Sequence, residues 1–290
     1  MKRMYYFLFL VICLSTSFVI AHEITRFSIE NKTSMLNRLV ADKSFLYISN
    51  IPNAINEVSG GGFISKLDKS GNIIESHFID KLDYPQGMVI INNVLYVVDS
   101  GKIKGFNLKT KRQVFNLKMN GTSMLGDIIA WDNNTLLASD VAGLILSVDI
   151  KKKSYNVFMS IESSLGIPYF LARYGDKLYV VTSDSNGRIL RIDINTKDIS
   201  YMSELSGRFY GIAITKNGGI LAIKNEDDSL DSMESGYDEV STMLYNINSQ
   251  GQIFIVDLQD FSTNISTFIV DSNDVWFIDM AGVDLIRVSI

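Results

Sequence analysis

Val94-Leu95-Tyr96-Val97-Val98-Asp99 is the stretch that decides the fold, because its pattern of an apolar strand ending in a polar residue recurs along the chain. Five further copies of the pattern occupy residues 45–50, 135–140, 177–182, 220–225 and 274–279. The equivalent leucine or valine residues follow one another at intervals of 41 to 54 residues. A period of this length is typical of architectures built from repeated supersecondary units.

Each copy continues into a second pair of apolar segments joined by a turn rich in Gly, Asn or Asp, as after residues 63–68 and 189–194. Four short strands per repeat form the blade of a β-propeller, so six copies predict a single all-β, six-bladed domain over residues 22–290. A β-sandwich needs no repeat of this length, and a parallel β-helix has a period of about 20 to 25 residues. The last copy lacks a fourth strand, and we expect residues 24–29 to join the last blade and close the ring.

Residues 1–21 have the pattern of a secretory signal peptide. Two basic residues precede an apolar run at 4–14, and small or aliphatic residues stand before a cleavage site at His22. The apolar run is too short for a transmembrane helix and no second one follows, so we expect no transmembrane segment after signal removal. Lipidation at Cys13 is the alternative interpretation of this segment.

Cys13 is the only cysteine, and it leaves with the signal peptide. The mature chain would then contain no disulfide, no thiol nucleophile and no cysteine-based zinc site. Export without disulfides, in a chain rich in Asn, Lys, Ile and Ser, indicates a bacterial protein that is periplasmic or secreted. The net charge of −5 argues against a nucleic-acid partner.

Two of the intervals between copies are lengthened by additional residues. We interpret residues 51–62 and 226–240 as insertions in loops, which leaves the number of blades at six. The face of the propeller that carries both insertions is the surface on which we expect a protein partner to bind.

The segments at 84–89 and 94–99 resemble the Pro-x-Gly lead-in and the Leu-Tyr-Val-x-Asp strand of six-bladed propellers related to gluconolactonase, luciferin-regenerating enzyme and NHL-repeat proteins. Residues 124–128 and 209–213 repeat the lead-in. The resemblance covers nearly all of the mature chain and implies the propeller fold, which is a scaffold for many unrelated functions. For the lactonase members it also implies one divalent cation in the central channel, held by Glu, Asn and Asp at the beginnings of innermost strands.

At the corresponding positions this sequence has different side chains, namely Asn37, Gln86, Gly126, Tyr169, Tyr210 and Ser266. A hard cation such as calcium prefers several oxygen ligands that include carboxylates, whereas this set consists mainly of amides and phenols. No metal ligand is therefore transferred from the family, and Asp127, one position from Gly126, is the one alternative. We instead predict a ligand site in the channel, formed by Asn37, Gln86, Asp127, Tyr169 and Tyr210.

The two tyrosines of this set have two possible roles. A phenol combines a stacking face with a hydrogen-bonding tip, which suits sugars and other cyclic polar molecules. Tyr169 and Tyr210 could equally fill the channel, and the sequence leaves both interpretations open.

A second repeated position lies at the far end of the same strand pattern. It carries a carboxylate or an amide in five of the six copies, namely Asn50, Asp99, Asp140, Asn225 and Asp279. Such a ring could bind a cation at the mouth of the channel. Asp and Asn also commonly end strands because their side chains accept hydrogen bonds from backbone N–H groups in turns. We interpret the repeated position as structural.

The sequence thus predicts an exported propeller that binds a small polar ligand or a protein partner and needs no cofactor. The alternative function is metal-dependent hydrolysis of sugar lactones or related esters. That reaction would require a divalent cation such as calcium to polarise the lactone carbonyl and activate water.

Overall fold

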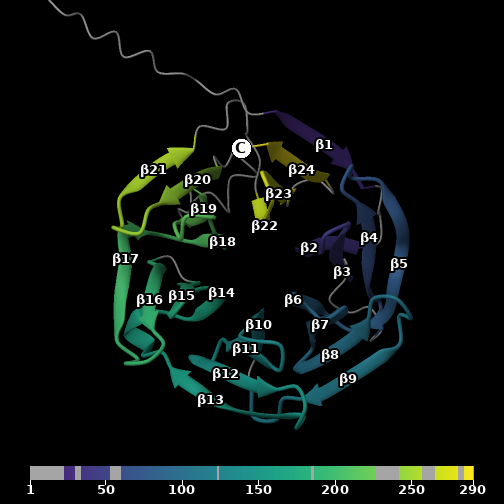
Figure 1. The fold of residues 1–290 in the computed structure, drawn as a ribbon, viewed down its shortest axis with the longest axis horizontal. Coiled ribbons are helices and arrows are strands. Elements are labelled where there is room, and N and C mark those ends of the chain that lie inside the picture. The colour runs from purple at the N-terminus through teal and green to yellow at the C-terminus, as the bar shows by residue number, and fades with distance from the viewer. Residues whose placement is uncertain are drawn as a thin grey trace, which may run out of the picture.

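The apolar runs of the repeat form strands, and consecutive strands joined by short connections pair as antiparallel sheets. The computed structural model describes residues 23–29, 34–52, 60–122, 124–183, 186–225, 242–256, 265–279 and 284–289. Within these residues, six four-stranded sheets stand as blades around a central axis (Figure 1). The all-β, six-bladed propeller predicted from the repeat is therefore confirmed.

Blades 1 to 3 each run from an innermost to an outermost strand in chain order. Blade 1 contains β2 (Ser34–Ala41), β3 (Phe45–Pro52), β4 (Gly62–Asp68) and β5 (Ile73–Leu82). Blade 2 contains β6 (Pro85–Ile91), β7 (Val94–Asp99), β8 (Lys102–Asn107) and β9 (Gln113–Lys118). Blade 3 contains β10 (Leu125–Ala130), β11 (Thr135–Asp140), β12 (Leu144–Asp149) and β13 (Ser154–Ser160).

Blades 4 and 5 follow the same order after a short 3₁₀ turn at Ser163–Leu165. Blade 4 contains β14 (Pro168–Tyr174), β15 (Lys177–Thr182), β16 (Arg188–Asp193) and β17 (Ile199–Ser206). Blade 5 contains β18 (Phe209–Ile214), β19 (Ile220–Asn225), β20 (Thr242–Ile247) and β21 (Ile253–Val256). Blade 6 contains β22 (Ile265–Asp271), β23 (Asp274–Asp279), β24 (Asp284–Ser289) and β1 (Ile24–Ser28).

Blade 6 closes the ring with strands from both ends of the described chain. β1 pairs antiparallel with β24, and Ile24 lies opposite Val288 (Figure 1). Phe27 stacks on the fully buried Trp276 with 5.8 Å between ring centroids. The expected closing strand is thus present, and it covers an edge that would otherwise be free to pair with other chains.

The core lies between adjacent blades, where the side chains of neighbouring sheets meet. The leucine or valine that defines the sequence repeat is buried in every blade, on the second strand, at Leu46, Leu95, Leu136, Leu178, Leu221 and Val275. One hydrophobic cluster, for example, joins Tyr96 and Ile103 of blade 2 to Leu136 and Val148 of blade 3. Burial between blades explains why the repeat is so apparent in the sequence.

The two predicted insertions connect the second and third strands of their blades. In blade 1 the connection runs from Pro52 to Gly62, so the ends of the predicted segment 51–62 belong to strands. In blade 5 it runs from Asn225 to Thr242. Most of both insertions, like the signal segment and Cys13, lies outside the described residues. Among the described residues, no helix has the length and hydropathy needed to cross a membrane.

Candidate functional site at the propeller centre

Each innermost strand contains a β-bulge near its beginning, where an extra residue interrupts pairing with the second strand. The register shifts between Leu36 and Arg38 in blade 1 and between Pro168 and Phe170 in blade 4, with equivalent shifts in the other four blades. The residues within these shifts include all six channel positions aligned from the sequence, namely Asn37, Gln86, Gly126, Tyr169, Tyr210 and Ser266. Bulges redirect side chains and are common beside functional sites. The backbone therefore distinguishes the same positions as the sequence repeat.

Arg38 and Asp127 occupy equivalent places in blades 1 and 3, directly after the bulge position. The amide of Arg38 donates to Ser49 Oγ at 3.0 Å, and the amide of Asp127 donates to Ser139 Oγ at 2.9 Å. Asp127 lies one residue after the aligned position Gly126. Its contact shows that it occupies a position that recurs between blades, as Arg38 does in blade 1. This position carries opposite charges in the two blades.

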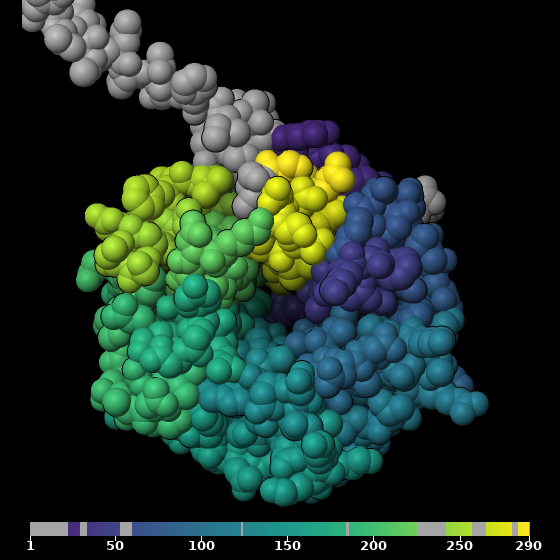
Figure 2. Space-filling view, in the orientation of Figure 1, coloured from purple at the N-terminus to yellow at the C-terminus, as the bar shows by residue number. Residues whose placement is uncertain are grey.

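The Arg38 side chain crosses the centre of the propeller. β2 contacts β6 and β22, and β14 lies three blades away on the opposite side of the ring. The Arg38 guanidinium nevertheless lies 4.5 Å from the centroid of the Phe170 ring and 5.4 Å from that of Tyr169, both on β14. Arg38 is only 7% exposed, and its Nε has no hydrogen-bond partner. Its contacts with Phe170 and Tyr169 place this buried, incompletely satisfied cation among the innermost strands. Figure 2 shows a hollow at the centre of the ring of blades.

Asp127 faces the same region from β10. Its Oδ2 accepts a hydrogen bond of 3.0 Å from the backbone N–H of Leu171 in the adjacent blade. Burial of the carboxyl by surrounding protein atoms raises the pKa of Asp127, while the positive charge of Arg38 and the Leu171 amide act in the opposite direction. Arg38 attracts Asp127, but the hydrogen bonds to this carboxylate come from the Leu171 and Ile128 amides, so it does not neutralise the guanidinium by direct contact.

Three of the other predicted site residues connect blades 1, 2 and 4. The Tyr169 hydroxyl donates to Gln86 Oε1 at 3.2 Å. Asn37 Nδ2 donates to the Pro85 carbonyl at 2.9 Å. Together with Arg38 and Asp127, these contacts place Asn37, Gln86 and Tyr169 in one polar cluster at the centre.

Tyr210 has different surroundings from the rest of the predicted set. It is partly buried and packs against the hydrophobic cluster of blades 5 and 6, which includes Leu221 and Phe268. The register in blade 5 also shifts one pair further along the strand than in blade 1, since Phe209 pairs with Lys224 before the shift. The described contacts therefore place Tyr210 against the apolar cluster between blades 5 and 6.

Arg38 is the residue of this cluster that the sequence interpretation did not include. The strand-start position predicts Asn37 in blade 1, and the following position entered the prediction only in blade 3, as Asp127. A usable signal was present, because an arginine between Asn37 and Leu39 interrupts an otherwise largely apolar inner strand. Buried arginines without a carboxylate partner are rare and costly.

The side chains near Asp127 do not fit the divalent cation that the gluconolactonase resemblance implies. A cation such as calcium needs several oxygen ligands, carboxylates among them. Asp127 is engaged by the Leu171 amide and lies beside the positive charge of Arg38, which would repel a metal ion. Within the part of the chain that the structure describes, no group of three or more His, Cys, Asp or Glu side chains is placed to hold a metal.

The repeated Asp and Asn residues at the ends of the second strands lie beside the beginnings of the innermost strands, as Asp99 pairs with Pro85, and they make local contacts. Asp99 is fully buried and accepts hydrogen bonds from the amides of Asp83 and Tyr84, at 2.8 and 2.7 Å, and from Lys104 Nζ at 2.5 Å. The other described side chains of the set are also engaged: Asn50 donates to Ser65 Oγ, Asp140 accepts from the Ala142 amide, and Asp279 pairs with Arg26. The side chain of Asn225 lies outside the described residues.

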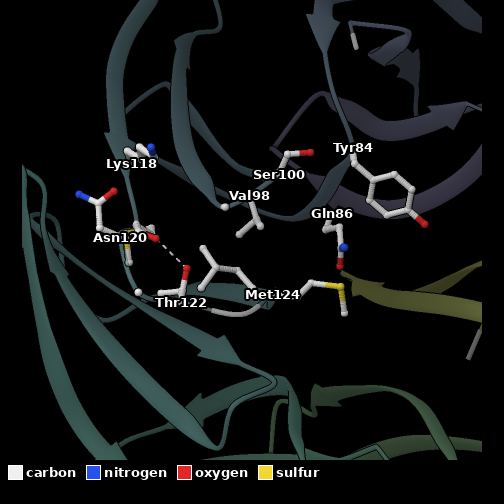
Figure 3. A pocket seen from close by; sticks show the side chains of 12 residues that line it. Tyr84, Gln86, Val98, Ser100, Lys118, Asn120, Thr122 and Met124 are labelled. Carbon is white, nitrogen blue, oxygen red and sulfur yellow. Dashed lines mark hydrogen bonds between the residues drawn. The ribbon is translucent and has the colours of Figure 1, made fainter. Parts of the chain in front are cut away.

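A pocket of about 710 Å³ opens between blades 2 and 3, beside the central cluster. Figure 3 shows Tyr84, Gln86 and Met124 grouped at one end of this pocket, and Lys118, Asn120 and Thr122 at the other. The Thr122 hydroxyl donates to the Met119 carbonyl at 2.8 Å (Figure 3). Gln86 therefore belongs both to the pocket and, through Tyr169, to the central cluster.

A second depression, of about 680 Å³, lies where the innermost strands of blades 1 and 6 end. Its charged lining includes an ion pair in which Lys69 Nζ lies 2.6 Å from Asp271 Oδ2. None of the described residues that line this depression has a buried side-chain polar atom without a partner, whereas Arg38 at the centre does.

No protein-family model matches the sequence, and no curated protein matches it. Solved structures do match the fold. A catalytically inactive virginiamycin B lyase from Staphylococcus aureus, in complex with quinupristin, is 13% identical with a TM-score of 0.60, and the match covers 93% of this chain and 99% of the lyase. A streptogramin B lyase is 13% identical with a TM-score of 0.62, covering 92% and 98%. The WD40 propeller domain of Doa1 is 16% identical with a TM-score of 0.62, covering 88% and 78%.

These similarities show the fold alone. Lyases and a WD40 domain share one architecture, which illustrates that a propeller hosts unrelated functions. The coarse resemblance to six-bladed propellers is therefore supported, whereas these matches do not single out the gluconolactonase and NHL group. The function must be argued from the central cluster itself.

Proposed function

We propose that the chain is an exported binding protein that takes up a small polar molecule at the centre of the propeller. The observation that carries the proposal is Arg38 at the centre of the ring. Its side chain is charged, the residue is only 7% exposed, and its Nε has no hydrogen-bond partner. Burying such a group costs free energy unless a hydrogen-bonding partner arrives. Natural proteins retain costs of this kind mainly at functional sites.

A small molecule fits this site better than a protein surface does. Arg38 and Gln86 are both buried, so a flat partner surface would not reach them. The pocket of about 710 Å³ next to Gln86 has the size of an ordinary small-molecule site. Its lining of amides, hydroxyls, apolar side chains and one lysine, Lys118, can satisfy a ligand that is polar at several points.

Two tyrosines on β14, Tyr169 and Tyr174, allow a controlled test of the central binding site. Tyr169 reaches Gln86 at the centre, whereas Tyr174, near the other end of the same strand, is 48% exposed. We expect some members of a panel of monosaccharides, polyols and small organic acids to raise the thermal unfolding midpoint. The Tyr169→Phe variant should bind such a molecule about threefold to tenfold more weakly, through loss of one hydrogen bond.

The Tyr174→Phe variant should bind the same molecule like the unmodified protein. If no member of the panel changes the unfolding midpoint, or if both variants lose affinity equally, the proposed central site is wrong. Either result would leave the propeller as a scaffold whose contacts lie elsewhere.

Export is a separate part of the proposal and rests on residues 1–21. We expect the mature protein to be periplasmic or secreted and to begin at His22, because signal peptidases cleave after small residues such as Ala21. N-terminal sequencing of the protein from the cell envelope or the medium tests this. An intact Met1 in the soluble fraction would contradict it, and a chain beginning at a lipidated Cys13 would replace secretion by anchoring.

A further inference from the structure

The charge at the centre is incompletely balanced. Among the described residues no carboxylate forms an ion pair with Arg38, and Asp127, which attracts it, is held by the Leu171 amide. Burial raises the pKa of Asp127, and the charge of Arg38 together with the amides of Leu171 and Ile128 opposes that shift. A buried guanidinium in this setting gains most from an additional anion.

The orientation of Arg38 leaves its hydrogen-bonding edge available. Phe170 and Tyr169 lie within 6 Å of the guanidinium carbon, in the range of cation–π contacts. Aromatic rings supply no hydrogen-bond acceptor in the plane of the guanidinium. The planar fork of N–H donors matches the two oxygens of a carboxylate in one plane.

We propose that the centre of the propeller binds the carboxylate of a small organic acid, with Arg38 as its charged partner. Gln86 and the Tyr169 hydroxyl then bind polar groups on the remainder of the molecule, next to the pocket between blades 2 and 3. This inference rests on the proposed small-molecule site and names its ligand class.

A singly charged carboxylate fits the site better than a phosphate. Only one buried arginine faces the centre in the described chain, and Asp127 lies close enough to interact with it. The second negative charge of a phosphate would have no second arginine at the centre to pair with among the described residues. Inorganic phosphate is therefore the discriminating competitor.

The experiment compares carboxylates with neutral molecules of nearly the same shape. The probes are acetate against acetamide, D-gluconate against D-glucitol, and phenylacetate against phenylacetamide, with inorganic phosphate as a further anion. Binding to the full protein is measured by calorimetry and by thermal shift at constant ionic strength. We expect at least one carboxylate to bind about tenfold or more tightly than its neutral counterpart, because hydrogen bonds to charged groups are the stronger ones.

Variants assign the effect to Arg38. Arg38→Lys retains the charge but loses the planar fork, and we expect it to lose about tenfold in affinity for that carboxylate. Arg173→Lys is the matched control, since Arg173 also lies on an inner strand and stacks on an aromatic ring, 4.2 Å from the centroid of Trp131. The control should bind like the unmodified protein. If Arg38→Lys fails to fold, the comparison of acids with neutral molecules on the unmodified protein still decides.

The outcomes separate this inference from the proposed function. If neutral probes bind as well as carboxylates and Tyr169→Phe weakens both, the small-molecule site stands and the assignment of a carboxylate is wrong. Tighter binding of phosphate than of every carboxylate also overturns the assignment. If no probe of either kind binds, both proposals fail.

Discussion

Two rings of repeated positions lie near one face of this propeller, and they differ in how their side chains are satisfied. The strand-end ring carries Asp or Asn in most blades, and a member such as Asp99 has all of its partners within its own blade or the adjoining turn. The second ring consists of the β-bulge positions at the beginnings of the innermost strands, where the backbone irregularity repeats but the side chains vary from blade to blade. The position directly after the bulge carries the incompletely satisfied Arg38 in blade 1. Repetition of a side chain indicates a structural role, whereas repetition of a backbone feature with varied side chains is what a ligand site without sixfold symmetry requires.

The largest expected effect is at the strand-end ring. We expect Asp99→Ala to lower the free energy of unfolding by about 3 to 5 kcal/mol, because it leaves the mostly buried Lys104 ammonium and two turn amides without their acceptor. Asp99→Asn should recover part of the loss, since an amide oxygen still accepts from the turn. Denaturant-induced unfolding measures both variants.

Asp176→Ala is the matched control for Asp99. Asp176 forms an ion pair of 3.3 Å with Lys177, but its side chain is 60% exposed. Exposed pairs contribute little, so the change should stay within about 1 kcal/mol. Equal effects at Asp99 and Asp176 would remove the structural role assigned to the strand-end ring.

Removing the charged group of the central cluster should increase the stability of the protein rather than lower it. We expect Arg38→Met to raise the free energy of unfolding of the unliganded protein by about 1 kcal/mol, because a buried donor without a partner is replaced by an apolar side chain of similar length. Arg173→Met should instead lower stability, since the Arg173 guanidinium donates to the Trp131 carbonyl. If Arg38→Met destabilises as much as Asp99→Ala does, Arg38 is part of the framework and not a site held ready for a ligand.

The difference between the rings also explains how much the sequence could predict. The blade number and the closing strand follow from burial, because Leu95 and its equivalents must face a neighbouring blade in every repeat. A regular constraint produces a regular pattern, and the pattern can be read without a structure. The six-bladed architecture, including closure by the strand at residues 24–28, was predictable for this reason.

The central cluster was predictable only in part. Asn37, Gln86, Asp127 and Tyr169 could be selected from their strand positions, but their contacts cross between blades. Arg38 was missed because its importance depends on Phe170 three blades away, a relation that no local spacing encodes. Contacts across the axis follow from ring closure, so they become visible only when all six blades are in place.

The smallest expected effect concerns Asp127 and sharpens the contrast at the centre. Burial raises the pKa of Asp127 above its ordinary value of 3.8, so between pH 3.8 and the pKa of the folded state the folded protein binds a proton more readily than the unfolded chain does. The free energy of unfolding of the unmodified protein, relative to Asp127→Asn, should therefore increase as the pH falls through this window and level off below 3.8. Denaturant unfolding of both proteins at a series of pH values measures the difference and cancels the other titrating groups.

A relative loss of stability on acidification would mean that the attraction of Arg38 outweighs burial and holds the pKa of Asp127 low. Arg38 would then already have its anion within the protein, and the two rings would both be structural.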